Sequence, residues 1–463
     1  MIFNLSTKKR SREDVDVDTC DLSHKRSSPA SRLYRHALES VFAFLSLSDL
    51  GATMRVNRSW STAVDCMRPI GAITTVRCEN MRLLAESRLT RHIAGLCVVA
   101  SRTGGDRFVD CGIVAGIIET NKSMTSLKLS RHNHIDTEGV VLIAAAIVYS
   151  QSLASLDLGY NSIGKNGAAA IASALAQSKS IVALALGGNL LGDDEAALIA
   201  QIKSLTLLDL SENSIGRDGA IAVAAAIARS DSMMISLDLR GNSIGNDGAV
   251  AISGAVAQSR SMTSLDVGSN QIGVKGAVAI AAALAQSHSM ASLNLLNNPI
   301  HKDGAAAIAT GIAQSKSMAS LDLGWGGIGK DGAVAIAAAI AQSTSMRTLD
   351  LSFNSIGDGG AVVLATAIAQ SGSMTSLNLY SNFISKDSAA AIVAAIAQSK
   401  SLTSLRLRDN VLEKDGAMAI VAAATHSKSM TSLDLLLNSI SKNDAQAIST
   451  ARARYKYKCE VIV

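Results

Sequence analysis

Side chains that perform acid–base or metal chemistry are sparse in this sequence and match no catalytic pattern. There is no Ser-His-Asp arrangement, no H-E-x-x-H motif, no Walker loop and no G-x-G-x-x-G loop. His132 and His134 flank one asparagine. Two loop histidines without further ligands indicate a polar surface rather than a metal site. We therefore expect a protein that is not an enzyme, with no catalytic residue, no metal and no cofactor.

A recurring L-x-L triplet carries an acidic residue at most of its middle positions. Two interpretations remain open: these residues are hydrogen-bonded parts of the repeat, or they form an acidic groove for a basic partner. Adjacent carboxylates about 4.8 Å apart would repel by about 1 kcal/mol or less in water. The middle residues are Lys128, Asp157, Ala185, Asp209, Asp238, Asp266, Asn294, Asp322, Asp350, Asn378, Arg406 and Asp434.

Large aromatic residues stand just after the triplet in three consecutive units. They are Trp325, Phe353 and Tyr380, and Arg406 and Arg408 follow in the next unit. Aromatics beside arginine are typical of interface hot spots, and aromatics make up only 3% of this chain. These five residues are therefore candidates for binding a substrate protein. The alternative is that Trp325 fills the space of an asparagine that its unit lacks, and that the other two rings pack on it.

The elements that position these residues repeat, mostly every 28 residues, as LDLxxNSIGxDGAxAIAxAIAQSxSMTS. "SLDL" alternates apolar and polar residues and predicts a short strand, and "GAVAIAAAIAQS" predicts a helix with an inner isoleucine stripe. The recurring Asp or Asn near the helix start, such as Asp218 or Asp247, is expected to cap it. A stacked asparagine column is expected to satisfy buried backbone groups. Its members are Asn161, Asn189, Asn213, Asn242, Asn270, Asn298, Asn354, Asn382, Asn410 and Asn438.

These units resemble the leucine-rich repeats of ribonuclease inhibitor and the Ran GTPase-activating proteins. The resemblance implies an α/β solenoid, a horseshoe with parallel strands on its concave face and helices outside. We expect residues 127–463 to form about twelve such units with a C-terminal cap, and residues 71–126 to be degenerate N-terminal repeats. The spacing of 24 between Asn189 and Asn213 predicts a helix that is shorter by about one turn.

Composition limits the location and the partners of the chain. Its net charge of +5 is mild for 463 residues and does not favour nucleic acid. Six cysteines without C-x-x-C spacing, no apolar run long enough to span a bilayer, and an early charged "STKKR" indicate a cytoplasmic or nuclear protein. Residues 1–30 are polar and mixed in charge, which predicts a disordered tail.

One segment, residues 31–70, does not belong to the repeat. "LYRHALESVFAFLSLSDLGATMRVNRSW" has a helical period and resembles the F-box motif, in which Tyr34 replaces the usual proline. The resemblance implies that a small all-α segment binds a Skp-type adaptor. The alternative is a helical cap on the first repeat. The residues that would bind the adaptor are Leu33, Leu38, Val41, Phe42, Leu45, Leu50, Val56 and Trp60.

An F-box ahead of leucine-rich repeats implies a non-catalytic, substrate-recognition subunit of a Skp–cullin–F-box type ubiquitin ligase. The repeats would bind an unknown protein substrate, and the chain would be monomeric outside its complex. One alternative is an interaction scaffold with a degenerate F-box. A less favoured one is a Ran-type GTPase activator, for which no catalytic residue can be placed in this sequence.

Overall fold

The structure is a computed structural model, and it describes residues 70–77, 93–99, 109–130, 133–441, 443–446 and 459–462. The chain divides into two compact units, Met1–Asn57 and Arg58–Val463. Every described residue belongs to the second unit, and the account below concerns that unit. The F-box-like residues of the segment 31–70 lie outside the described residues.

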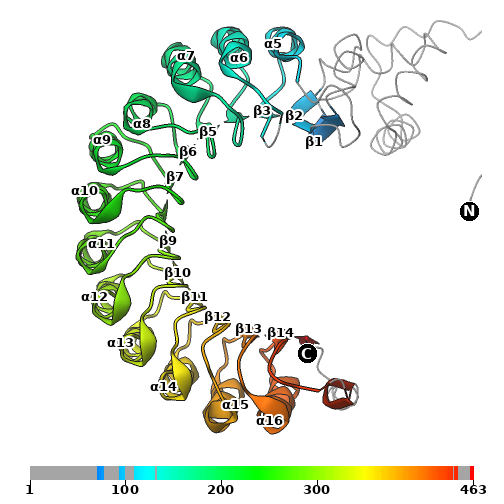
Figure 1. Cartoon of the computed structure of the whole chain (residues 1–463), viewed down its shortest axis with the longest axis vertical. Coiled ribbons are helices and arrows are strands. Elements are labelled where there is room, and N and C mark those ends of the chain that lie inside the picture. Colours follow the sequence, from blue (N-terminus) through cyan, green and yellow to red (C-terminus); the bar gives the residue numbers. More distant parts are fainter. Residues whose placement is uncertain are drawn as a thin grey trace, which may run out of the picture. The chain divides into compact units, whose positions relative to one another are not determined.

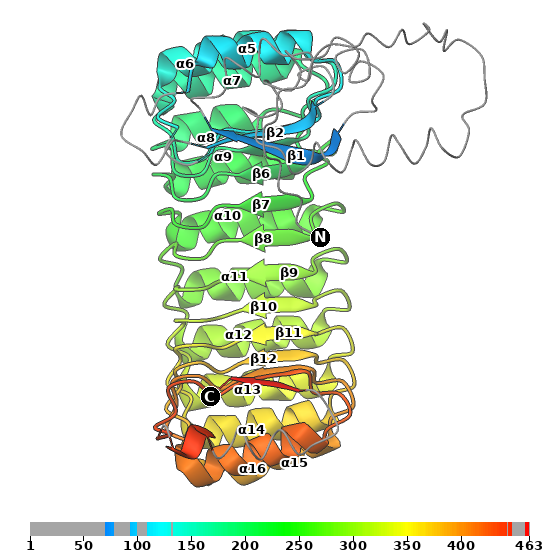
Figure 2. The same ribbon diagram turned by 90° about the vertical axis from the view of Figure 1, so that its right-hand side faces the viewer.

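A parallel sheet runs through the whole second unit. Its fifteen described strands pair in chain order, and Figure 2 shows β6 to β12 stacked one above the next. Each leucine of one triplet is in register with that of the next, as Leu321 is with Leu349. The strands are β1 (Ile70–Arg77), β2 (Ile93–Val99), β3 (Ser126–Lys128), β4 (Ser155–Asp157), β5 (Ala183–Ala185), β6 (Leu207–Asp209), β7 (Ser236–Asp238), β8 (Ser264–Asp266), β9 (Ser292–Asn294), β10 (Ser320–Asp322), β11 (Thr348–Asp350), β12 (Ser376–Asn378), β13 (Ser404–Arg406), β14 (Ser432–Asp434) and β15 (Glu460–Ile462).

Helices return the chain from one strand to the next and form the outer layer of the arc in Figure 1. Strands lie about 4.8 Å apart and helices are about 10 Å wide, so the stack curves with its strands inside. The predicted α/β solenoid is therefore confirmed. The helices are α5 (Cys111–Thr120), α6 (Thr137–Tyr149), α7 (Gly164–Gln177), α8 (Asp193–Ala200), α9 (Arg217–Ile227), α10 (Gly245–Gln258), α11 (Val274–Gln286), α12 (His301–Gln314), α13 (Gly329–Gln342), α14 (Gly357–Gln370), the 3-10 turn η3 (Lys386–Ser388), α15 (Ala389–Gln398) and α16 (Glu413–His426).

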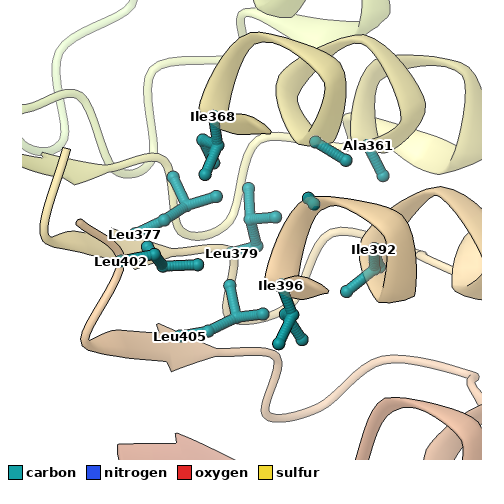
Figure 3. A pocket seen from close by; sticks show the side chains of 10 residues that line it. Ala361, Ile368, Leu377, Leu379, Ile392, Ile396, Leu402 and Leu405 are labelled. Atoms are coloured by element: carbon teal, nitrogen blue, oxygen red, sulfur yellow. The ribbon is translucent and has the colours of Figure 1, made fainter. Parts of the chain in front are cut away.

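The core lies between the sheet and the helices. Leu377 and Leu379 of one repeat meet Ile392 and Ile396 of α15, and all four are at most 4% exposed. Figure 3 shows these side chains pointing towards one another around a void of about 10 Å³ lined only by apolar residues. An apolar void of that size stays dry. Each repeat thus buries its leucines only with its neighbours, which makes the stack cooperative.

The unit between Asn189 and Asn213 contains a shortened α-helix. Its helix α8 spans eight residues, whereas most helices of the described chain span thirteen or fourteen. The missing turn was expected from the spacing of 24 residues. Strand β5 keeps its register with β4 and β6, so the missing residues shorten only the helical side of this repeat.

The prediction that each helix is capped by its own Asp or Asn is wrong. Asp218 and Asp247 lie inside the first turns of α9 and α10, where no side-chain cap forms. They face the positive end of the helix dipole instead. Several caps come from the preceding repeat. The Oδ1 atom of Asn246 accepts from the N–H groups of Gly273 and Gly276, both at 2.9 Å, where α11 begins.

Among the residues that the structure describes, no helix is long and apolar enough to cross a membrane. Within the same residues, His, Cys, Asp and Glu side chains form no group of three that could hold a metal ion.

Candidate functional site

Asparagine side chains join successive repeats through buried hydrogen bonds. The Asn354 amide donates to the carbonyls of Leu323 and Leu351, at 2.8 and 3.0 Å. Its Oδ1 atom accepts from the backbone N–H groups of Gly326 and Ile328, at 3.0 and 3.2 Å. The same donation to the preceding repeat recurs at Asn161, Asn189, Asn213, Asn242, Asn270, Asn298, Asn382, Asn410 and Asn438.

The column has one member that the spacing concealed. Asn133 donates to the carbonyl of Val98 at 3.0 Å, across to strand β2. Its unit contains one extra residue before the turn, so a fixed count from the leucine misses it. The extra residue was visible in the sequence as "LKLSRHNHI", and allowing for it would have found Asn133.

The column is interrupted at Gly326, and the preceding repeat compensates. The N–H of Ile300, which would face a side chain at position 326, donates instead to the carbonyl of Asn298 at 2.7 Å. Pro299 lies between these two residues, and its fixed φ favours such a tight turn. A Cβ at Gly326 would meet Leu323 O at 3.0 Å. A larger side chain at position 326 would therefore be crowded, and Ile300 satisfies its N–H within its own repeat.

The acidic triplet residues have a structural role in the backbone. Asp322 Oδ1 accepts from the N–H of Gly324 at 2.9 Å, and Asn294 makes the same bond with Leu296 at 2.8 Å. The bond closes a turn at the end of each strand. It recurs at Asp157, Asp209, Asp238, Asp266, Asp350, Asn378 and Asp434.

The second oxygen of several of these carboxylates is bound by a side chain one strand away. Asn294 donates to Asp266 Oδ2 at 2.9 Å, and Lys128 pairs with Asp157 Oδ2 at 3.1 Å. Arg406, a predicted binding residue, pairs with Asp434 Oδ2 at 3.4 Å. The concave face therefore accepts an amide or a cation beside an aspartate.

Burial perturbs the carboxylates in the middle of this row. Desolvation, opposed by the hydrogen bond from Arg240 and reinforced by the charges of Asp266 and Asp209, raises the pKa of Asp238 to about 6. Desolvation together with the charge of Asp350 raises the pKa of Asp322 to about 6. Charging these groups is costly in the free protein, so a nearby cation would be favourable.

Four of the predicted binding residues form one contiguous row, which we call the aromatic ledge: Trp325, Phe353, Tyr380 and Arg408. The rings of Trp325 and Phe353 stack with centroids 4.4 Å apart, and Phe353 meets Tyr380 edge to face at 4.5 Å. The Arg408 guanidinium lies 5.8 Å from the Tyr380 centroid. Its buried Nε finds no hydrogen-bond partner within the described residues. The structure thus brings together residues 27 or 28 positions apart.

The ledge is held in an unfavourable backbone conformation. Trp325 and Phe353 have φ of 53° and 56°, where bulky L-residues are rare. This position is left-handed throughout the described repeats from β4 to β14, and the remaining residues there are Tyr160, Gly188, Glu212, Gly241, Ser269, Asn297, Ser381, Asp409 and Leu437. Most of these are glycine or polar residues, whereas large apolar side chains are strained in this conformation, so the rings of Trp325 and Phe353 are kept at a cost.

The Trp325 ring remains accessible. It is 55% exposed, and it borders an open hollow of about 520 Å³ on the same surface. The other residues around the hollow are Ser269, Leu296, Asn297, Ser352 and Phe353. A stacked, exposed tryptophan beside a hollow is suited to receive an apolar side chain of another protein.

The second set of predicted site residues lies outside the described part of the chain. No geometry bears on the adaptor-binding residues Leu33, Leu38, Val41, Phe42, Leu45, Leu50, Val56 and Trp60.

Comparison with known proteins identifies the repeats. The family model described as "Leucine Rich repeat" matches residues 120–144, 149–172, 201–224, 230–253, 258–281, 314–337, 342–365 and 398–421. No curated protein sequence matches the chain. One solved structure, the complex of Rad7 and Elc1 from yeast, aligns with a TM-score of 0.48 at 14% identity, over 90% of each chain. The described residues of this chain are a leucine-rich-repeat solenoid, a fold that serves as a protein-interaction scaffold.

Proposed function

We propose that this protein is a non-catalytic receptor whose repeats capture a partner protein through the aromatic ledge. The observation that carries the proposal is that Trp325 and Phe353 occupy left-handed backbone positions while the tryptophan remains half exposed. Strain kept at an exposed aromatic cluster is typical of a binding site.

In its finer form, the proposal is that the receptor serves a Skp–cullin–F-box type ubiquitin ligase in the cytoplasm or nucleus. The segment 31–70 would bind a Skp-type adaptor, and the repeats would hold the substrate near the ubiquitin-loading enzyme, contributing proximity. The support is the gap-free match to the F-box pattern from Val41 to Trp60. Residues 1–30 would be a tail, and residues 71–126 would be the degenerate repeats that begin the solenoid.

The experiment is a pull-down of purified Skp-type adaptor by the full-length protein. Wild type should retain the adaptor, and Phe42→Ala with Trp60→Ala should abolish retention because both apolar anchors are removed. The matched control is Trp325→Asn, which should retain the adaptor fully. If wild type retains none, the ubiquitin-ligase form is wrong and an interaction scaffold remains.

A further inference from the structure

A second hollow opens over strands β4 to β7, three strands before strand β10, where the ledge begins. It has a volume of about 220 Å³. Its floor is Ala183 and Ala185 of β5, and one wall is Leu207 of β6. Ala183 is in register with Leu207, and Ala185 with Asp209, so the floor and that wall are neighbours across one strand pair.

The hollow lies where two neighbouring repeats depart from the consensus, and Val182 and Ile235 add further aliphatic residues just before β5 and β7. Outside β5, every triplet from β3 to β14 has a charged or amide residue where Ala185 stands. In the position of Leu207, all the others have serine, threonine or alanine. Val182 and Ile235 replace small, polar or basic residues in the flanking positions. The side chains of Val182, Leu207 and Ile235 are 38 to 45% exposed.

Acidic residues border the apolar surface. Asp157, Asp209 and Asp238 line the hollow. Asp157 and Asp209 lie on either side of β5, so their backbones are about 9.6 Å apart. Asp157 is paired with Lys128, whereas Asp209 and Asp238 form no ion pair with any described residue. The hollow therefore joins an aliphatic side chain to two carboxylates that form no ion pair with a described residue, although the charge of Arg240 acts on Asp238.

We propose that this hollow is a docking site for a partner-protein segment that carries lysine or arginine beside an apolar side chain. The alkyl stem of the basic residue would cover Ala185, and its charged head would reach Asp209 and Asp238. The apolar neighbour would pack on Leu207. Charge complementarity identifies the occupant, because an acidic or wholly apolar segment would leave two carboxylates desolvated.

The chain itself shows that this face accepts a cation. Lys128 reaches Asp157 from the adjacent strand at 3.1 Å, and Arg406 reaches Asp434 at 3.4 Å. A docked lysine would reproduce these pairs with Asp209. Burial raises the pKa of Asp238 although the hydrogen bond and charge of Arg240 oppose this shift, and docking of a further cation would lower that pKa.

The test is selection of phage-displayed random peptides on the full-length protein, with selected peptides measured by fluorescence polarisation. We expect peptides that place lysine or arginine beside leucine, isoleucine or phenylalanine. Their affinity should fall with added salt, because the contact is electrostatic. It should fall about tenfold in Asp209→Asn.

A consensus variant provides the specific control. Leu207→Ser with Ala185→Asn restores residues that other repeats carry at these positions, so the repeat still folds. The new amide would bind a neighbouring carboxylate as Asn294 binds Asp266, which closes the site. This variant should lose binding, whereas Asp322→Asn and Trp325→Asn should keep it. Acidic selected peptides, no selected peptides, or equal binding by the consensus variant would overturn the proposal without affecting the ledge.

Discussion

Replacing Trp325 by Asn, Gly or Ala separates the binding role of the ring from the cost of its backbone. The ring is 45% buried by difference from its exposed fraction of 55%, which corresponds to about 100 Å² of contact and about 2.5 kcal/mol. Loss of its stacking on Phe353 adds about 1 kcal/mol. All three variants lose these contributions equally.

The three variants differ only in how they tolerate φ of 53°. Glycine and asparagine adopt this conformation readily, whereas alanine retains a strain of about 1 kcal/mol. We therefore expect Trp325→Ala to be destabilised by about 3.5 kcal/mol and the other two variants by about 2.5 kcal/mol. Asn297 in the adjacent repeat has φ of 55°, which makes Trp325→Asn the matched variant.

Unfolding in urea, followed by far-ultraviolet circular dichroism, measures this order. Fluorescence is unsuitable because Trp325 is one of only two tryptophans. Partner capture, in contrast, should fall to the same degree in all three variants, since each lacks the ring. An alanine variant as stable as the asparagine variant would refute the backbone argument, and capture that follows stability would refute the binding role.

Two further predictions concern the column and the acidic row. Asn354→Ala should destabilise the protein by about 3 kcal/mol in urea unfolding, because the N–H groups of Gly326 and Ile328 lose their acceptor; a loss below about 1 kcal/mol would contradict this. Asp238→Asn with Asp322→Asn keeps the turn hydrogen bonds and removes two carboxylates whose pKa is raised to about 6. A carboxylate whose pKa is raised on folding destabilises the folded wild type once the pH is high enough to ionise it. The midpoint of thermal unfolding of the double variant should therefore exceed that of wild type near pH 7 and equal it below about pH 4. An equal increase at both pH values would show that the charge is not responsible.

The repeat made the solenoid predictable from the sequence. Leucines at fixed spacing identify the strand and its core face, and each copy repeats the same information. Asn133 was not predicted because one inserted residue moves it out of the constant spacing from the first leucine of its triplet. The predicted helix caps were wrong because an acidic residue near a helix start can play either of two roles. It can cap the helix from the position before it, or it can lie inside the first turn and interact with the helix dipole. Sequence alone does not distinguish them.

Geometry between repeats was less predictable. The row of Trp325, Phe353 and Tyr380 was visible as three aromatics in consecutive units, but their stacking and left-handed backbone required coordinates. The hollow over β5 depends on Ala185 and Leu207 being neighbours across strands, and only the strand register shows this.

The central claim is that the repeats capture a protein through the ledge while a separate segment binds the adaptor. Quantitative affinity purification of full-length wild type, Trp325→Asn with Phe353→Ser, and Phe42→Ala with Trp60→Ala tests both parts in one measurement. The account predicts that the ledge variant loses a substrate protein and keeps the Skp-type adaptor, and that the segment variant does the reverse. Retention of the same proteins by wild type and the ledge variant would contradict it.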